Sequence, residues 1–265
     1  MTGNDTKRES SKKVLFFMKK IDICGVLISA TNLTDACRSI GDWIREKRKI
    51  YICVAPVSTI VDCQESKEYR NIINNAAMVT PDGMPVVWLG KLKGDRVIER
   101  TYGPDLLLSL SKVSEDKGFK HYFYGGSEKT CQLLQNVLKT RFPRLQIAGM
   151  FAPEMRPIHF KEEASVIKRI NDAKPDVLWV GLGSPKQDHW MVEHRALLDV
   201  PVIIGVGAAF DFIAGVKKQA PYWMQRSGLE WLFRLSTEPK RLWKRYLFGN
   251  LKFIYYLMKH TLTVH

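Results

Sequence analysis

The sequence predicts an α/β fold, with a Rossmann-like, mostly parallel sheet flanked by helices and a C-terminal basic amphipathic helical appendage. Two apolar runs, Val177–Gly181 and residues 202–206, are rich in β-branched side chains, and each leads into a glycine turn. Continuous runs of this kind are typical of central strands in a sheet that is covered on both faces. Strand and helix patterns also alternate along the chain, and this alternation predicts parallel strands joined by right-handed crossovers.

The chain is expected to contain three segments. Residues 1–13 have no apolar residue beyond Met1 and are expected to form a disordered leader. Residues 14–225 are expected to form an α/β core, and residues 226–265 a C-terminal helical appendage that associates with a membrane. Strands are predicted at Ile50–Ala55, 121–124, Val177–Gly181 and 202–206. Helices are predicted at residues 59–75, Met84–Leu92, 105–116, 127–140, 161–172 and 185–198. Asp105 and Ser127 are the expected N-caps of the third and fourth of these helices.

Composition limits the class of protein. The 265 residues, 45% apolar content and mean hydropathy of −0.18 describe a globular chain that can bury one substantial core. A formal charge of +14 favours polyanionic partners: nucleic acid, anionic lipid or a phosphorylated substrate. Five cysteines without a C-x-x-C pair suit a reducing cytoplasm. Because neither a secretory signal nor an apolar run of about 20 residues is visible, membrane association is expected to be peripheral.

The segment 240–259 differs in kind from the core. It holds six basic residues and no acidic one, and one helical stripe is formed by Trp243, Leu247, Leu251, Ile254 and Met258. A basic amphipathic helix with interfacial aromatics suits the surface of an anionic membrane. The alternative is a C-terminal helix packed on the core, and the two are compatible. Gly249 and Asn250 could break this helix into two.

Polar side chains follow the predicted strands, where ligands bind in parallel sheets. Asp82 lies in the PDGMP turn before a helix, Gly125 and Gly126 precede another helix, and Gln187 and Asp211 follow the two central strands. Each has a structural alternative. Asp82 could be a turn or N-cap residue, the glycine pair an ordinary tight turn, and Gln187 and Asp211 polar residues at helix ends.

Seven motifs, in order, resemble those of the WecG/TagA/CpsF glycosyltransferases: PDGMP (81–85), YGPD (102–105), YGG (124–126), GLGSPKQ (181–187), GVGAAFDFIAG (205–215), QAP (219–221) and GLEWLFRL (228–235). The resemblance covers residues 21–246. It implies inverting transfer of a hexose-type sugar from a UDP-sugar to a polyprenyl (undecaprenyl)-diphosphate-linked saccharide, in bacterial polysaccharide or cell-wall polymer synthesis. It also implies a cytoplasmic protein, bound peripherally to the inner face of the plasma membrane.

The resemblance assigns roles to several residues. It implies that Asp82 is the catalytic base and that C-terminal arginines, here Arg234 and Arg241, close over the site. Substrate contacts are expected from Ser58, Gly125, Gly126, Gln187, Asp211, Lys244 and Arg245. Two departures bear on these assignments: Lys244 stands where the family has an arginine, and Ala55-Pro56-Val57-Ser58 replaces a Thr-x-Asn pattern near the acceptor. The second departure removes polar side chains that would discriminate among acceptors or donor sugars.

A metal-free mechanism is expected, with no cofactor besides the UDP-sugar substrate. No Asp-x-Asp motif occurs, and His189 and His194 are five residues apart, off the spacing that places two ligands on one helical face. Arginine suits bidentate contact with the departing diphosphate, although a solvated basic face would also explain these cations.

The basic charge and the glycine turns raise two other functions. A non-catalytic basic module that binds nucleotides or nucleic acid would explain the charge, but no nucleic-acid-binding motif supports it, and no nucleic-acid partner is expected. A Rossmann oxidoreductase is excluded because the third glycine of G-x-G-x-x-G is missing after both central strands. The sequence leaves the oligomeric state open, a homo-oligomer included.

Overall fold

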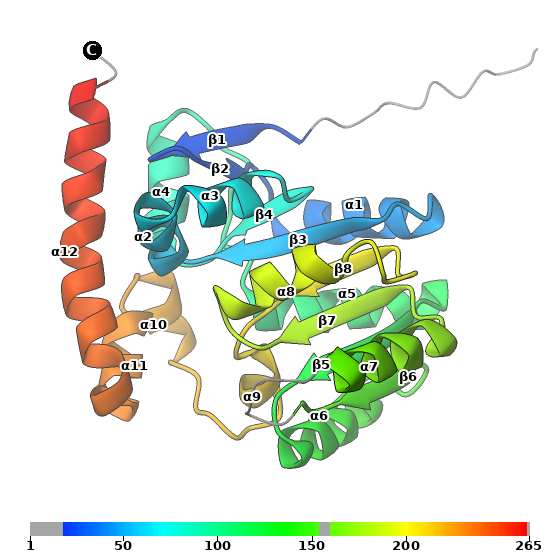
Figure 1. The fold of residues 1–265 in the computed structure, drawn as a ribbon. Helices are drawn as coiled ribbons and strands as arrows, with labels where there is room; N and C mark the ends of the chain where they lie inside the picture. Colours follow the sequence, from blue (N-terminus) through cyan, green and yellow to red (C-terminus); the bar gives the residue numbers. More distant parts are fainter. Residues whose placement is uncertain (1–17, 154–159, 264–265) are drawn as a thin grey trace, which may run out of the picture.

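The computed structural model describes residues 18–153 and 160–263, so the predicted leader lies outside the described residues. The predicted fold class is confirmed: six parallel strands form one sheet in the order β4-β3-β8-β7-β5-β6 (Figure 1). These strands are β3 (Ile50–Ala55), β4 (Met78–Pro81), β5 (Lys120–Gly125), β6 (Gln146–Phe151), β7 (Val177–Gly181) and β8 (Val202–Gly205). An antiparallel hairpin, β1 (Lys20–Ile23) and β2 (Val26–Ser29), packs beside β4.

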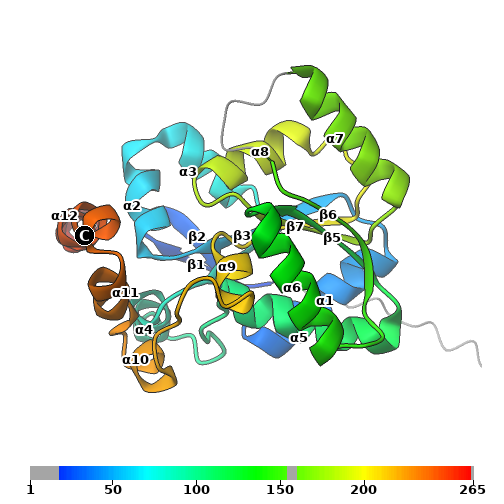
Figure 2. The ribbon, with the colours of Figure 1, turned by 90° about the horizontal axis from the view of Figure 1, so that it is seen from below.

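Helices cover both faces of the sheet (Figure 2). One face packs against α1 (Leu33–Arg45), α5 (Gly103–Lys117), α6 (Glu128–Arg141) and α9 (Ala209–Ile213). The other packs against α2 (Val57–Glu65), α3 (Lys67–Asn74), α7 (Phe160–Ala173) and α8 (Lys186–His194). At one side of the molecule lie α4 (Met84–Leu92), α10 (Tyr222–Arg226), α11 (Glu230–Thr237) and α12 (Pro239–Thr263).

The two-sided cover explains why the central strands read as continuous apolar runs. Leu178 and Trp179 are neighbours in β7, both are fully buried, and they belong to core clusters on opposite faces of the sheet. Side chains alternate between the faces of a strand, so a sheet with two cores needs apolar residues at successive positions. All five cysteines are buried free thiols, and burial raises the pKa of Cys37 to about 12.

Several predicted boundaries are wrong for local reasons. The single helix expected at 59–75 is two helices, because Ser66 is extended and its hydroxyl caps α3 by accepting a hydrogen bond from the amide of Tyr69. Asp105 is not an N-cap, since α5 begins at Gly103 and Asp105 lies in its first turn. The predicted cap Ser127 is confirmed, with its hydroxyl accepting from the amide of Thr130. The prediction missed α1, the β1–β2 hairpin, β4 and β6.

Helix α12 is continuous through Gly249 and Asn250, so the expected break is absent. It packs along α2, and Phe253 is buried in the core cluster on that face of the sheet. The predicted stripe lies on a different face of the helix, where the exposed fraction of its residues ranges from 44% at Trp243 to 61% at Leu251. The helix is therefore both packed on the core and left with an apolar stripe in solvent. Among the described residues, no helix combines the length and apolar character required to cross a membrane.

The carboxyl ends of β5 and β7 approach closely at two glycines. A Cβ on Gly125 would lie 2.5 Å from the carbonyl oxygen of Gly181, and Gly125 has a φ of 130°. A side chain at this position would meet backbone atoms, which cannot move aside without separating the two strands. Gly125 thus has a packing role, and the YGG turn is not explained by diphosphate contact alone.

We expect Gly125→Ala to lower the free energy of unfolding by roughly 3 kcal/mol or more, because backbone strain and steric overlap add. Gly183→Ala is the matched control: Gly183 also has a positive φ, 81°, but no atom lies within 4 Å of a Cβ built there. Its expected cost is roughly 1–2 kcal/mol. Urea denaturation followed by circular dichroism measures both, and equal losses would contradict the close-packing argument.

Candidate active site

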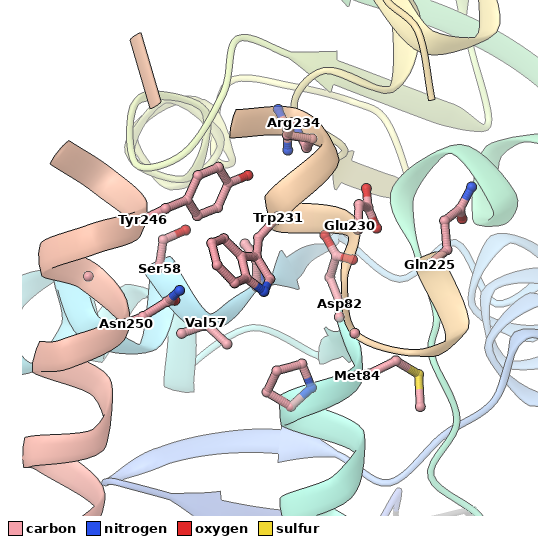
Figure 3. Close-up of a pocket in the computed structure, with 15 residues that line it drawn as sticks. Val57, Ser58, Asp82, Met84, Gln225, Glu230, Trp231, Arg234, Tyr246 and Asn250 are labelled. Atoms are coloured by element: carbon pink, nitrogen blue, oxygen red, sulfur yellow. The ribbon is translucent and has the colours of Figure 1, made fainter. Parts of the chain in front are cut away.

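Two adjoining pockets open at the carboxyl ends of the central strands and share Pro56, Asp82 and Arg234. The strand-end pocket, about 140 Å³, lies against the turns after β7 and β8 and includes Ser184, Gln187, Gly207 and Lys217. The helical pocket, about 120 Å³, lies between α2, α4 and the C-terminal helices and includes Ser58, Met84, Glu230, Trp231, Tyr246 and Asn250 (Figure 3). The position follows the general rule for ligands of parallel sheets.

Asp82 stands where the two pockets meet. It directly follows β4, and its amide donates a hydrogen bond to the carbonyl of Ala55 at the end of β3. Gly83, with a φ of 90°, turns the chain into α4 and occupies the N-cap position without a side-chain bond. Asp82 is therefore a turn residue and not the N-cap. Its side chain is only 18% exposed and lies beside Glu230 and Trp231 (Figure 3).

The carboxyl of Asp82 is held in an unusual electrostatic environment. Burial raises its pKa to about 6; the charges of Arg100 and Arg234 oppose this rise, and those of Glu230 and Asp105 add to it. Two largely buried carboxylates, Asp82 and Glu230, and the more exposed Asp105 thus share two guanidinium groups. Desolvation and nearby like charges disfavour an ionised carboxylate, which explains why the pKa of Asp82 is raised. A pKa raised towards neutrality suits a carboxylate that has to accept a proton.

Arg100 connects this carboxylate to the C-terminal helices. Its Nη2 donates to Oε2 of Glu230 at 2.6 Å, and its Nη1 donates to Oε1 of Gln225 at 2.8 Å. The guanidinium carbon lies 4.0 Å from the ring centre of Tyr102. Its Nε is buried, has no hydrogen-bond partner among the described residues, and is 3.9 Å from Oδ1 of Asp82. Arg100 therefore fastens α10 and α11 to the core, while its Nε lies near the Asp82 carboxylate without a hydrogen bond.

Arg234, a predicted site residue, lines both pockets from α11. Its guanidinium carbon lies 5.4 Å from the ring centre of Phe212, and its buried Nε has no hydrogen-bond partner in the described part of the chain. A partly buried guanidinium with an unused donor is suited to an anionic ligand. The side chains of the other predicted arginines, Arg241 and Arg245, lie outside what the structure describes.

Gln187 lines the strand-end pocket, but its side chain already holds the two central turns together. Its Oε1 accepts from the amides of Gly183 and Gly207, and its Nε2 donates to Ser184 Oγ at 3.1 Å. The side chain is almost completely buried. Gln187 thus holds together the turns after β7 and β8, against which the strand-end pocket lies.

The remaining predicted residues divide between the pockets and their surroundings. Ser58 lines the helical pocket and also a neighbouring groove between α2 and α12, where Lys244 lies. Asp211 lines neither pocket; it accepts from Thr130 Oγ1 at 3.2 Å and pairs at 3.1 Å with Lys217, which lines the strand-end pocket. Gly125 and Gly126 likewise lie outside them.

The sequence did not indicate Arg100 at all, and it included Glu230 only as one residue of the GLEWLFRL motif. Arg100 precedes the YGPD motif, but no local pattern there indicates a functional arginine. Its partners are more than 100 residues away, at Gln225 and Glu230. Only the folded chain brings them together.

His189 and His194, whose spacing in the sequence does not suit paired metal ligands, make separate ring contacts in the structure. Within residues 18–153 and 160–263, no three His, Cys, Asp or Glu side chains gather so that they could hold a metal ion. His189 stacks on Tyr69, and His194 stacks on Trp190.

We expect Glu230→Gln to lower the pKa of Asp82 below about 6, because it removes a negative charge that raises that pKa and frees Arg100. Arg100→Gln should shift it in the opposite direction, because the larger of the two compensating positive charges is lost. Carboxyl carbon NMR of the Asp82 side chain as a function of pH measures both. Shifts of the same sign in the two variants would contradict this arrangement of charges.

Comparison with known proteins agrees with the motifs. The model of the Glycosyl transferase WecG/TagA/CpsF family matches residues 21–265. An N-acetylglucosaminyldiphosphoundecaprenol N-acetyl-beta-D-mannosaminyltransferase of Bacillus subtilis (strain 168) is 31% identical over 183 residues, 69% of each chain. Proteins of the same name from Bacillus spizizenii and Staphylococcus aureus (strain NCTC 8325 / PS 47) are 29% and 28% identical, over 82% and 89% of each chain. Since the family match runs from the hairpin through the Asp82 turn to the last helix, the chain belongs to the WecG/TagA/CpsF family and is a glycosyltransferase.

Proposed function

We propose that this enzyme transfers an N-acetylmannosaminyl group from a UDP-sugar to a polyprenyl (undecaprenyl)-diphosphate-linked N-acetylglucosamine, with inversion at the anomeric carbon. The observation that carries the proposal is the buried Asp82 carboxyl, with a pKa of about 6, between two arginines at the strand ends. The sugar and the acceptor are those in the printed names of the relatives at 28–31% identity.

Asp82 acts as the general base in this proposal. It takes the proton from the acceptor hydroxyl as that oxygen attacks the anomeric carbon and the bond to UDP breaks on the opposite face. One displacement of this kind converts an α-linked nucleotide sugar into a β-linked product. The name of the relatives, which specifies a beta-D-mannosaminyl group, supports this stereochemistry. A base with a pKa close to the working pH combines the ionised state with the ability to hold a proton.

Arg234 stabilises the departing diphosphate. Its position on the border of both pockets lets it reach a group that links a nucleoside in the strand-end pocket to a sugar near Asp82. Charge stabilisation from fixed donors in a poorly solvated site is typically a large contribution to catalysis. Arg100, already bound to Glu230 and Gln225, orients the site. Because positive charge is supplied by these side chains, we propose that no metal ion is needed.

The alternative of a non-catalytic module that binds nucleotides or nucleic acid is not favoured, because the family consists of glycosyltransferases. The basic charge instead suits a diphosphate substrate and an anionic bilayer. We propose that the exposed stripe of α12 and the basic residues around it dock reversibly on the inner face of the plasma membrane, where the lipid-linked acceptor is found. Each Lys or Arg near such a surface contributes about 1 kcal/mol.

The direct test offers the protein a panel of UDP-sugars and a polyprenyl-diphosphate-linked N-acetylglucosamine. We expect a single added N-acetylhexosamine by mass spectrometry and a β-linkage by NMR. Asp82→Asn should lower kcat by about 10²–10⁴-fold while UDP affinity stays near that of the wild type, since the base acts on the acceptor proton. Turnover close to wild type in Asp82→Asn would remove this carboxylate from the mechanism.

Activity should be unchanged by EDTA. Arg234→Ala should lower kcat by about 10²–10³-fold, the usual effect of removing one donor that stabilises developing charge. Arg144→Ala is the control, because Arg144 lines neither pocket, is exposed and pairs with Asp116 near the C-terminal end of α5. Loss of turnover in EDTA that added Mg²⁺ or Mn²⁺ restores would refute the metal-free mechanism.

Vesicle binding should depend on the α12 stripe and weaken as salt rises. Leu251→Glu together with Ile254→Glu, at positions 61% and 53% exposed, should reduce co-sedimentation with anionic vesicles. Val192→Glu with Leu197→Glu adds the same charge near α8 and should have no effect. If the α12 variant sediments as the wild type does, the stripe is not a membrane-binding face.

A further inference from the structure

We propose that α4 and α10 carry a second bilayer-binding surface, the α4–α10 patch, formed by Trp88, Leu92, Tyr222 and Trp223 and distinct from the α12 stripe. Its partner is the headgroup region of an anionic bilayer at the mouth of the helical pocket. This inference rests on the proposed function, because it concerns how a lipid-linked acceptor reaches Asp82.

The patch exposes large side chains that a soluble surface usually covers. Leu92 is 82% exposed, Tyr222 69%, Trp223 64% and Trp88 46%. Trp88 and Leu92 are four residues apart and therefore lie on one face of α4. Grouped exposed apolar residues mark interaction sites, and tryptophan and tyrosine in particular favour the membrane interface, where one part of the ring is in apolar surroundings and the other is hydrated.

The charge around these residues suits an anionic surface. Neither α4 nor α10 contains an aspartate or glutamate, while Lys91 and Arg226 are exposed beside the aromatic residues. The guanidinium carbon of Arg226 lies 5.4 Å from the ring centre of Tyr222. Cations that flank interfacial aromatics add electrostatic attraction to apolar burial.

The two helices also form one side of the pocket mouth. Met84 and Pro85, in the first turn of α4, line the helical pocket, as do Gln225 of α10 and Gly228 just after it. The Trp88 ring packs against Gly228, where a Cβ would lie 2.7 Å from it. Both ribbon views place α4, α10, α11 and α12 on one side of the molecule, away from α6 and α7 (Figures 1 and 2).

The position of the α4–α10 patch at the pocket mouth favours a bilayer over a protein as its partner. The prenyl chain of the acceptor stays in the membrane while its sugar must reach Asp82, so the bilayer has to meet the protein where the helical pocket opens. The α12 stripe alone would hold the protein at the surface without orienting that opening. With α4 and α10 also in contact, the pocket mouth faces the headgroups.

The first experiment uses the full chain with Leu92→Glu and Trp223→Glu combined. The partition coefficient of this variant onto phosphatidylcholine vesicles containing phosphatidylglycerol should fall by about tenfold or more. The reason is that glutamate at these positions loses the favourable free energy of burying a large apolar side chain in the bilayer interface. The control combines Leu133→Glu and Val137→Glu on α6, each at a position 36% exposed, and should bind as the wild type does. Turnover of a short-chain, water-soluble acceptor should be unchanged in both, which verifies that the site is folded.

The second experiment places a probe without disturbing charge. Because the native cysteines are all buried, Leu92→Cys can be labelled selectively with an environment-sensitive fluorophore. Its emission should shift to the blue when anionic vesicles are added, and a label at Val137→Cys should not respond. An unresponsive Leu92 label, or vesicle binding of the Leu92→Glu/Trp223→Glu protein equal to wild type, overturns the inference.

The outcomes also separate this inference from the proposed function. If the wild type does not turn over the short-chain acceptor, the proposed function fails. If the wild type is active but the patch variant binds vesicles normally, only the α4–α10 patch fails. A patch variant that loses self-association in sedimentation velocity, with vesicle binding intact, identifies the surface as a protein interface and overturns the bilayer assignment.

Discussion

The structure of the site depends on the pairing of Arg100 with Glu230. This ion pair, at 2.6 Å, and the bond from Arg100 to Gln225 join the core to the two short helices that complete the helical pocket. Both side chains are largely buried, at 11% and 19% exposure, so the pair is far less weakened by solvent than one on the surface. Breaking a buried pair would leave an uncompensated charge, which is strongly unfavourable.

The same pairing determines how Asp82 behaves. Arg100 makes its short contact with Glu230, and its nearest atom to the Asp82 carboxylate is 3.9 Å away. Asp82 is therefore desolvated without receiving a full ion pair, and its pKa is raised rather than lowered. A fold that optimised stability alone would pair this carboxylate or expose it. An undercompensated carboxylate in a pocket is instead typical of acid–base sites.

Helices α11 and α12 contribute side chains to the helical pocket, and α12 also exposes an apolar stripe. Helix α11 contributes Glu230 and Arg234 to the pocket, and α12 contributes Tyr246 and Asn250 while its buried Phe253 packs into the core cluster. The opposite stripe of α12 is exposed. Helix α12 therefore has two apolar faces with different environments, one packed into the core cluster and one in solvent.

The sequence alone determined the fold class, the two central strands and the order of the motifs, because these depend on local hydrophobic periodicity and on glycine at strand ends. It also indicated Asp82 and Arg234, which lie in recognisable segments, and the α12 stripe, whose spacing is helical. It did not reveal β4, whose four residues MVTP are too few to show a pattern, or the break at Ser66, which depends on a single cap.

Tertiary structure alone decided which residues share the site. Arg100 meets Gln225 and Glu230 across 125 and 130 residues, and no local pattern encodes such a contact. It also showed that Gln187 lines the strand-end pocket while bonded to both turns, that Asp211 pairs with Lys217, and that Gly125 and Gly126 do not line either pocket. The physical reason is that periodicity reports which face of an element is buried, whereas desolvation, ion pairing and the pKa of Asp82 depend on groups that only the folded chain brings together.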